Sequence, residues 1–286
     1  MPERPPVVLT IAGFDPSSGA GVTADIKTIS AHGCYGVACI TAMTVQSTAG
    51  VRRVEAVDAS LITETLQELT ADMPIAAVHI GMLGTAKVVR VVADFLAQST
   101  GKAGFPKLPN VVLDPILKSS SGADLLDAPG IKILVEKLIP LADVLTPNVD
   151  EAALLTGLNV TNLDEMRAAA NKLHQMGSFA MVITGGHLEK AIDLLSFTSK
   201  RGIEQEVFKA ERQRSNSTHG TGCAFSTAMA CHLALDRGLP EAALLAKTYV
   251  TAAITAGHPL GRGTGPVHHL YRMHQQRRAA GSGGEA

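Results

Sequence analysis

A cysteine directly follows a glycine-threonine-glycine turn in the stretch NSTHGTGCAFSTAMACHLA, which begins at Asn216. Gly220 and Gly222 let the backbone turn tightly, and the apolar residues after Cys223 indicate a helix. The unpaired N–H groups at such a helix start, that of Thr221 among them, bind anions. The positive helix end would also stabilise a thiolate, so Cys223 could act as a base or nucleophile near neutral pH. The alternative is that the glycines cap a buried helix and Cys223 packs in the core.

The segment AGFDPSSGAGVTADIKT predicts a glycine-rich loop that follows a strand and opens a helix. It has neither the GK[ST] of a Walker A loop nor the GxGxxG spacing of a dinucleotide-binding loop. Asp25, in the first turns of the helix, could face back toward the loop and accept hydrogen bonds from a substrate hydroxyl or amine. The alternative is a carboxylate that the helix dipole favours at this position.

Two further segments place carboxylates where a metal ion could bind. In TPNVDEAALLTG, Asn148 and Glu151 stand three residues apart at a strand-to-helix junction, which suits a magnesium ion that keeps its waters. A helix cap with Glu151 at the third helical position has the same spacing, and both can hold together. Asp114 in VLDPIL is an acid at an apolar strand end, where an unpaired charge is costly. We therefore expect a metal, a phosphate-linked water or a basic partner beside Asp114.

Six short, largely apolar segments predict the strands that must position these residues. They are Val7 to Phe14, Val37 to Gln46, Ala76 to Leu83, Asn110 to Leu117, Ala142 to Asn148 and Phe179 to Gly186. Helical patterns lie between them, at Gly21 to His32, Ser60 to Met73, Ala86 to Gln98, Pro129 to Leu138 and Asp164 to Met176. The alternation predicts an α/β fold with a doubly wound, mostly parallel sheet flanked by helices on both faces.

The later segments predict an antiparallel edge pair, Ala191 to Phe197 with Gly202 to Arg212, and two closing helices, Cys223 to Leu235 and Glu241 to Ala256. Ligands of such sheets bind beyond the carboxyl ends of the strands. The expected strand ends carry polar or glycine residues on one rim: Gly13, Asp15, Gln46, Gly81, Met82, Asp114, Asn148 and Thr184 to Gly186. This rim is where we expect the site.

Composition narrows the class of protein. The 286 residues carry a net charge of −1, with 46% hydrophobic and 18% charged residues, which indicates a compact domain with no basic surface for nucleic acid or membrane. No apolar run approaches the roughly 20 residues that span a bilayer. Four cysteines without metal spacing favour a reduced cytoplasmic setting, and the apolar N-terminal run is expected to be a buried strand, not a signal peptide. We expect one domain over residues 1–278 and a disordered tail over 279–286.

Eight segments occur in the order and spacing of one family: TIAGFDPSSGAGVTADIKT, TAMTVQST, HIGMLG, VVLDP, TPNVDEAALLTG, ITGGHL, THGTGCAFS and GTGPVHHL. From Val7 to Leu270 the sequence resembles the hydroxymethylpyrimidine/phosphomethylpyrimidine kinases of thiamine biosynthesis, in the ribokinase-like superfamily. The resemblance implies ATP-dependent phosphorylation of 4-amino-5-hydroxymethyl-2-methylpyrimidine, and then of its monophosphate to the diphosphate. It also implies a homodimer and a requirement for Mg²⁺.

The resemblance assigns roles to particular residues. Those implied to contact the pyrimidine are Gly13, Asp25, Gln46, Met82 and Ile116. Those implied around the nucleotide are Asp114, Lys118, Asn148, Glu151, Thr184 and Gly186, with Asp114 and Glu151 near Mg²⁺, directly or through water. The GTGC turn falls where many related sugar kinases carry GTGD, so Cys223 would be the catalytic base. The N–H groups of Gly220, Thr221, Gly222 and Cys223 would stabilise the transferring phosphoryl group.

Some positions depart from the family pattern. Thr184 stands where relatives often have a lysine near the nucleotide phosphates, and Ser120 where another lysine is common. Lys118, two residues before Ser120, could compensate, and Phe14 replaces a small polar residue.

A pyridoxal or pyridoxine kinase is the nearest alternative, because such enzymes share the GTGC turn and phosphorylate a ring of similar size. The other alternative is a protein that binds the pyrimidine without catalysing its phosphorylation. The replacement of the expected lysine by Thr184 supports this alternative.

Overall fold

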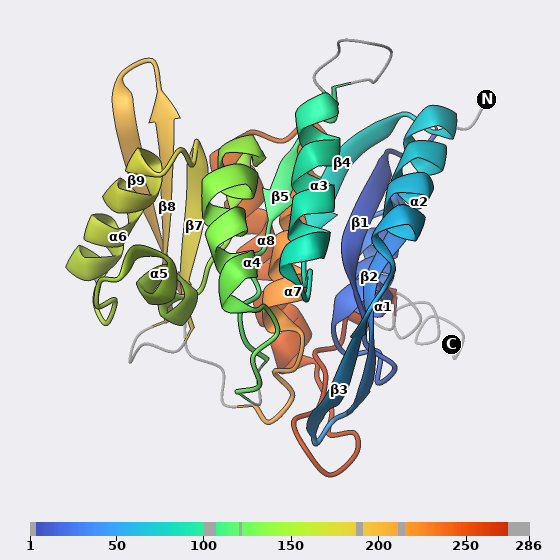
Figure 1. Ribbon diagram of the computed structural model, residues 1–286. Coiled ribbons are helices and arrows are strands. Elements are labelled where there is room, and N and C mark those ends of the chain that lie inside the picture. The colour runs from blue at the N-terminus through green and yellow to red at the C-terminus, as the bar shows by residue number, and fades with distance from the viewer. Residues whose placement is uncertain (1–3, 100–106, 120–121, 187–190, 211–214, 274–286) are drawn as a thin grey trace.

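The computed structural model describes residues 4–99, 107–119, 122–186, 191–210 and 215–273 (Figure 1). One nine-stranded sheet runs through the molecule in the order β3-β2-β1-β4-β5-β6-β7-β8-β9. The strands are β1 Val7–Phe14, β2 Tyr35–Ser47, β3 Gly50–Ala56, β4 Ile75–Ile80, β5 Val111–Leu113, β6 Val144–Leu145, β7 Ala180–Gly185, β8 Ala191–Ser199 and β9 Gly202–Ala210. The six central strands are parallel, while β3, β8 and β9 pair antiparallel at the two edges. The predicted α/β fold with a mostly parallel sheet is confirmed.

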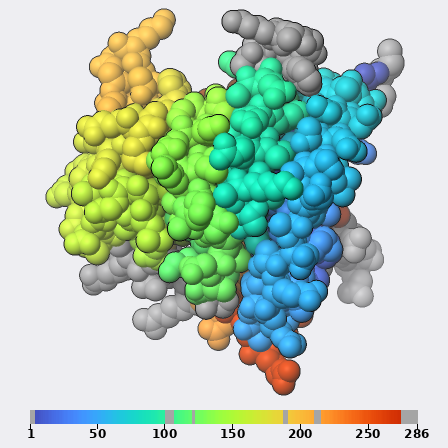
Figure 2. All heavy atoms as spheres, viewed as in Figure 1, coloured from blue at the N-terminus to red at the C-terminus, as the bar shows by residue number. Residues whose placement is uncertain are grey.

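Helices cover both faces of the sheet. They are α1 Gly21–Ala31, α2 Ala59–Asp72, α3 Ala86–Gln98, α4 Ala128–Ile133, α5 Val149–Thr156, α6 Leu163–Gln175, α7 Thr221–Ala234 and α8 Leu239–Thr255. One core cluster lies under α2, α3, α5 and α6, and a second lies between the sheet and α1, α7 and α8. Figure 2 shows α2, α3, α4 and α6 side by side as a closed surface over the front face. The site must therefore open at a rim of the sheet.

Helix α7 differs from the surface helices because it is apolar on all sides. Eleven of its residues are buried, from Cys223 at its start to Ala234 at its end. Small side chains such as Ala224, Ala228 and Ala230 let it approach β4 and β5 closely. A helix without a polar face is stable only inside the protein. Its N-terminus is thereby fixed against the ends of the central strands.

Several predicted boundaries are wrong in an informative way. The fourth and fifth predicted strands shrink to β5 and β6, because Pro115 and Pro147 lack the N–H that a central strand donates. The segment GVRRVEA forms β3 but was not predicted as a strand, because its charged residues interrupt the apolar pattern. Such residues are tolerated in β3 because it lies at the edge of the sheet. Helix α5 was expected only as a helix start after Asn148, and α8 begins earlier than predicted, with a proline in its first turn.

The β2–β3 hairpin projects beyond the helices and is held by the loop that follows α8 (Figures 1 and 2). Thr264 donates its N–H to the carbonyl of Thr48 at 3.1 Å, and the backbone of Gly263 lies directly against Thr48. No helix of the described residues is long and apolar enough to cross a membrane. The predicted tail at residues 279–286 lies outside the described residues.

Candidate active site

Two glycine-rich turns from opposite ends of the chain meet at the rim. Gly220, the N-cap of α7, has φ +80°, and a Cβ there would lie 1.8 Å from the carbonyl oxygen of Gly19. Gly21 has φ +58°, and its Cβ would lie 2.2 Å from the carbonyl oxygen of Gly13. Only glycine fits either position. The first N–H groups of α7 are thus placed beside the β1–α1 loop, a contact that the sequence analysis did not predict.

Cys223 lies in the first turn of α7 and is 8% exposed. The backbone N–H of Gly21 interacts with its sulfur, which favours the thiolate. Burial and the charges of Asp25 and Asp114 outweigh that contact and raise the pKa of the Cys223 thiol well above its ordinary value. The expectation of a stabilised thiolate is therefore wrong. The helix start is present, but burial and the charges of three carboxylates, Asp25, Asp114 and Asp15, disfavour the thiolate.

Asp25 lies beneath the rim and does not face the loop as predicted. Its carboxylate is fully buried and accepts hydrogen bonds from the hydroxyls of Thr10 at 2.7 Å and Thr227 at 2.8 Å. Nδ1 of His79 lies 3.3 Å from the same carboxylate. Burial favours a neutral His79 ring, but the charge and hydrogen bond of Asp25 raise the pKa of His79 above its ordinary value. Asp25 thus belongs to a buried polar cluster with Thr10, His79 and Thr227 that supports the site from below.

The other residues predicted to contact the pyrimidine line neighbouring strand ends. Gly13 packs on Met82, because a Cβ at Gly13 would lie 3.0 Å from the Met82 sulfur. Met82 is 8% exposed, and its carbonyl accepts the hydroxyl of Thr41. Ile116 is partly exposed, and its Cδ1 lies 3.7 Å from the Cβ position of Gly81. The structure thus brings a soft apolar wall to the ends of β1, β4 and β5.

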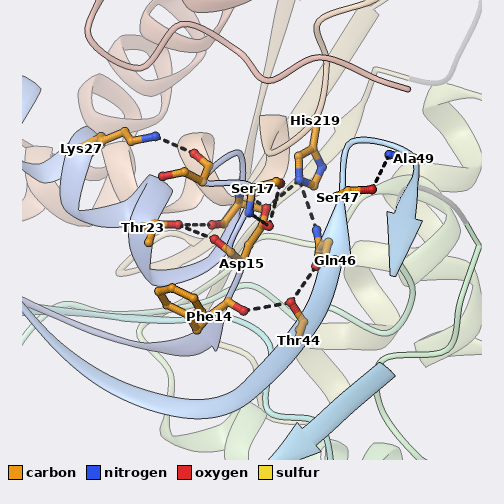
Figure 3. A network of polar contacts seen from close by, with 12 residues as sticks. Phe14, Asp15, Ser17, Thr23, Lys27, Thr44, Gln46, Ser47, Ala49 and His219 are labelled. Atoms are coloured by element: carbon orange, nitrogen blue, oxygen red, sulfur yellow. Dashed lines mark hydrogen bonds and ion pairs between the residues drawn. The ribbon is translucent and has the colours of Figure 1, made fainter. Parts of the chain in front are cut away.

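Gln46 belongs to a polar network that Figure 3 shows in full. Its carboxamide lies 3.1 Å from the hydroxyl of Thr44 and 3.3 Å from Nε2 of His219. The same Nε2 lies 2.8 Å from the Asp15 carboxylate, which also accepts hydrogen bonds from Ser17. Although burial opposes it, the hydrogen bonds from His219 and Ser17 lower the pKa of Asp15.

His219 is a site residue that the sequence analysis missed. It stands inside the THGTGC motif, one residue before Gly220, so its position in the motif was the available signal. A histidine beside a glycine turn has many structural explanations. Only the fold shows that Asp15 and Gln46 converge on it.

The nucleotide half of the rim contains two buried carboxylates. Asp114 is 5% exposed, and its Oδ2 lies 3.7 Å from the Cβ position of Gly222. Burial raises the pKa of Asp114 to about 6, although His79 and Ser226 oppose the shift. Burial, and then the charge of Asp114, raise the pKa of Glu151 to about 8. Burial thus favours the neutral form of both carboxyls, and among the described residues the causes of these shifts include no lysine or arginine.

Glu151 also closes the predicted helix cap. Its Oε2 accepts the N–H of Asn148 at 2.9 Å, and the Asn148 side chain accepts the N–H of Glu151 at 2.9 Å. The capping interpretation is confirmed, and the capping hydrogen bond from Asn148 opposes the rise in the pKa of Glu151 without cancelling it. The capping box holds the carboxylate in place at the strand end.

The donor set fits a magnesium ion that is held mainly by waters and nucleotide phosphates. In the part of the chain that the structure describes, no three His, Cys, Asp or Glu side chains form a metal-binding group. Mg²⁺ commonly uses only one or two protein carboxylates beside phosphates and waters. Asp114 and Glu151, with raised pKa values, are carboxylates that a nearby dication would stabilise in their charged form.

Three further residues predicted for the nucleotide lie at or beside the same rim. The N–H of Thr184 donates to the carbonyl of Pro147 at 2.9 Å, which joins β7 to the Asn148 turn. Gly186 is exposed directly after β7. The ammonium group of Lys118 lies 3.6 Å from Asp124, and both side chains are mostly exposed. Lys118 therefore points along its own loop, toward Asp124.

A buried cation that the sequence analysis missed lies near the end of β7. Lys247, on α8, pairs with Asp193 at 2.5 Å, and the two side chains are 12% and 7% exposed. The other carboxylate oxygen of Asp193 accepts the N–H of Gly185 at 3.0 Å. The pair thus fixes the backbone immediately before Gly186, which is the region where Thr184 replaces the expected lysine.

The fold and this rim place the chain among the ribokinase-like small-molecule kinases. The chain belongs to the phosphomethylpyrimidine kinase family, whose model matches residues 15–268. A hydroxymethylpyrimidine/phosphomethylpyrimidine kinase of Streptomyces coelicolor is 40% identical over 273 residues, covering 95% of this chain and 97% of that protein. A thiamine biosynthesis bifunctional protein, ThiED, of Geobacter sulfurreducens is 39% identical over 92% of this chain. The chain spans only 52% of that longer protein.

Solved structures of two activities share the fold. An ADP complex of Bacillus subtilis pyridoxal kinase superposes with a TM-score of 0.83 at 33% identity, covering 94% of this chain and 99% of that one. A phosphomethylpyrimidine kinase of Clostridium difficile superposes with a TM-score of 0.76 at 36% identity, covering 87% of this chain and 99% of that one. The chain is therefore a phosphotransferase of this family, and nucleotide complexes of its structural neighbours support ATP as the phosphoryl donor.

Proposed function

We propose that the protein transfers a phosphoryl group from ATP to 4-amino-5-hydroxymethyl-2-methylpyrimidine, and then to the monophosphate. The observation that carries this proposal is the meeting of the GTGC turn with the Gly13, Gln46 and Met82 rim, in a chain of the phosphomethylpyrimidine kinase family. Gln46 offers hydrogen bonds to the aminopyrimidine, and Met82 offers an apolar wall. The substrate hydroxymethyl would then point toward Cys223 and the start of α7.

The proposed chemistry follows the phosphoryl-transfer rule that positioning and charge stabilisation dominate. The N–H groups at the start of α7, from Thr221 to Cys223, would stabilise the transferring phosphoryl group. When bound, Mg²⁺ supplies charge neutralisation at the phosphates, and we place it near Asp114 and Glu151. Cys223 would accept the hydroxymethyl proton. Burial, and then the charges of Asp25 and Asp114, raise the pKa of Cys223, so balancing the charge of Asp114 would lower that pKa and increase the fraction of thiolate, the form that accepts a proton.

The two phosphorylations should differ in their need for a base. A hydroxymethyl group must lose a proton as it attacks, whereas the oxygen of a phosphate ester is already anionic. We expect Cys223→Ala to lower kcat for the alcohol by about 100-fold or more and kcat for the monophosphate by less than about 10-fold. Single-turnover assays with each substrate and product identification as mono- or diphosphate measure this difference.

Cys231→Ala is the matched control, because Cys231 lies two turns further along α7 and is fully buried in the core. This control should lose stability and keep both activities. Equal losses of the two phosphorylations in Cys223→Ala would contradict the role of Cys223 as a base. Absence of any ATP turnover by the unmodified protein would instead favour a non-catalytic pyrimidine-binding protein.

Phosphorylation of pyridoxal is the second candidate, because the pyridoxal kinase of Bacillus subtilis superposes closely on this chain. A vitamin B6 ring also carries a hydroxymethyl group and has a similar size. Steady-state comparison of the two substrates with ATP decides between them. A larger kcat/KM for pyridoxal would reverse our assignment.

We also propose the Mg²⁺ requirement, a homodimer and a cytoplasmic location. Chelation of Mg²⁺ should abolish turnover and spare binding of the pyrimidine, which calorimetry with and without EDTA tests.

Met43 and Val45, on one face of β2, are 46% and 45% exposed, which supports contact with a second copy of the chain. A monomer by light scattering at micromolar concentration would contradict the dimer. The four free cysteines support a reducing compartment.

A further inference from the structure

His219 joins three segments that form the acceptor side of the site. Its ring packs on the β1–α1 loop, since a Cβ at Gly19 would lie 2.3 Å from Cδ2 of the ring. Its Nε2 lies 2.8 Å from Asp15 and 3.3 Å from Gln46, and the side chain is 14% exposed (Figure 3). His219 is therefore placed between the glycine loop and a residue that we assign to the pyrimidine.

The Asp15 carboxylate fixes the proton of His219. It accepts hydrogen bonds from the N–H and hydroxyl of Ser17 and from the N–H of Ala20. An ionised carboxylate only accepts hydrogen bonds. Because Nε2 of His219 lies 2.8 Å from Oδ2 of Asp15, that nitrogen must carry the hydrogen. His219 is thus a donor at the atom that also faces Gln46.

The hydrogen-bond inventory then fixes the orientation of the Gln46 carboxamide. As drawn in Figure 3, Nε2 of Gln46 faces Nε2 of His219, so that two donors oppose each other. The hydroxyl of Thr44 is likewise shared between the carbonyl of Phe14 at 2.9 Å and Oε1 of Gln46 at 3.1 Å, although it has one hydrogen. Half a turn of the carboxamide resolves both conflicts. Oε1 then shares the single Nε2 hydrogen of His219 with Asp15 in a three-centre hydrogen bond, whose shorter arm of 2.8 Å goes to Asp15 and whose longer arm of 3.3 Å goes to Gln46, and Nε2 of Gln46 donates to Thr44.

We propose that Asp15 and His219 act as positioning residues that lock the Gln46 carboxamide and thereby select the aminopyrimidine ring over a vitamin B6 ring. This inference rests on the proposed contact between Gln46 and the pyrimidine. The locked carboxamide retains one N–H and one oxygen lone pair for a ligand. That pair matches a ring nitrogen beside an exocyclic amine, as Gln or Asn matches the edge of adenine.

Discrimination follows from the group next to the substrate hydroxymethyl. In the aminopyrimidine this neighbour is an amine, which donates, and in pyridoxal it is an aldehyde, which accepts. A locked carboxamide oxygen binds the first and repels the second. A carboxamide that can turn would offer its N–H to the aldehyde. Loss of the His219 hydrogen should therefore weaken pyrimidine binding and relax the choice between the two rings.

The test compares both substrates in His219→Phe, which keeps a ring against Gly19 and removes the donor. We expect kcat/KM for the aminopyrimidine to fall by about 30-fold to 100-fold, mainly through KM, and kcat/KM for pyridoxal to stay within about 3-fold. His219→Gln should restore part of the selectivity, because its N–H can donate to Asp15. An equal loss of kcat/KM for both substrates would show that His219 only holds the surrounding segments together, and it would overturn the proposal.

A double-mutant cycle separates His219 from Gln46. In a Gln46→Ala background, His219→Phe should change the selectivity by less than about 3-fold, since there is no carboxamide left to lock. Additive losses would overturn the proposal. If Gln46→Ala keeps the wild-type selectivity, the assignment of Gln46 to the pyrimidine is itself wrong, which is a separate failure.

A matched histidine controls for packing. His174 on α6 is partly buried, and its ring nitrogens lie 2.9 Å from the Ser178 carbonyl and 3.0 Å from the Ser196 hydroxyl. His174→Phe should lower the melting temperature as His219→Phe does and leave the ratio of the two kcat/KM values unchanged. A change of that ratio in His174→Phe would mean that stability alone alters selectivity, which contradicts the specific role of His219.

Discussion

The two halves of the rim are built differently. On the acceptor side, Asp15 and Asp25 are each surrounded by protein donors, and the hydrogen bonds to Asp15 lower its pKa. On the nucleotide side, burial raises the pKa of Asp114 to about 6 and that of Glu151 to about 8. The acceptor side is therefore organised by the chain alone, whereas burial favours the neutral carboxyls on the nucleotide side, and a nearby cation would stabilise their charged form. Four substitutions test this contrast.

The largest effect is expected where the two glycine turns touch. Gly220→Ala places a Cβ 1.8 Å from the carbonyl oxygen of Gly19 and puts alanine at φ +80°. The loops must separate, so kcat/KM should fall by about 1,000-fold, because a displacement of 1 Å already costs about 100-fold. Gly238→Ala, with nothing within 4 Å and no positive φ, is the control and should be neutral. Wild-type kinetics in Gly220→Ala would show that the contact is dispensable.

Glu151→Gln should stabilise the ligand-free protein while impairing nucleotide use. A carboxyl whose pKa rises from 4.5 to about 8 on folding destabilises the native state above pH 4.5, increasingly up to pH 8. We expect a gain of about 2–4 kcal/mol at pH 8.5 and almost none at pH 4.5. Urea unfolding at the two pH values measures it, and glutamine keeps the helix cap.

Glu165→Gln is the matched control for that result. Glu165 holds the third position of α6 after the N-cap Asn162, but it is partly exposed, and the hydrogen bonds from Thr161 lower its pKa. Its replacement should bring no gain in stability at high pH. A gain of equal size in both variants would mean that the burial of charge at Glu151 is not the cause.

Thr227→Val tests the acceptor side from below. The substitution removes the 2.8 Å hydrogen bond to the buried carboxylate of Asp25 and leaves the packing volume nearly unchanged. We expect a loss of about 2 kcal/mol in the free energy of unfolding. Thr248→Val, which removes a hydrogen bond from an exposed hydroxyl to the Leu244 carbonyl of its own helix, should change stability by less than about 0.5 kcal/mol. Equal losses in the free energy of unfolding would show that the hydrogen bond from Thr227 to Asp25 contributes no more to stability than that of Thr248.

The smallest effect on stability is expected at Lys118. Its exposed ion pair with Asp124 at 3.6 Å should contribute less than about 0.5 kcal/mol. If Lys118 turns toward the nucleotide to replace the lysine missing at Thr184, Lys118→Ala should raise KM for ATP by about 3-fold to 10-fold. Lys132→Ala, which breaks a similar exposed pair with Glu136, should leave KM unchanged. An unchanged KM in Lys118→Ala would exclude the compensating role.

The sequence predicted the elements better than the environments. The bounds of β1 are those predicted, because an apolar run ends at a glycine-rich loop. Asp25 was placed on the correct helix but given the wrong surroundings, since one of its partners, Thr227, lies 202 residues away. The pKa of Cys223 was predicted in the wrong direction for the same reason. A helix start is visible in sequence, whereas the carboxylates that β5 and α1 bring beside it are not.

The contact between His219 and Asp15 also sets the order in which the protein can be made. The two residues are 204 positions apart, so a ribosome adding about 5–20 residues per second synthesises Asp15 about 10–40 s before its partner. During that interval β1, β2 and β4 can pair, while the glycine loop has no GTGC turn to rest on. The emerging chain therefore lacks a complete acceptor site until residues after Cys223 have been translated, because the backbone of His219 also pairs with Gly265 and Val267.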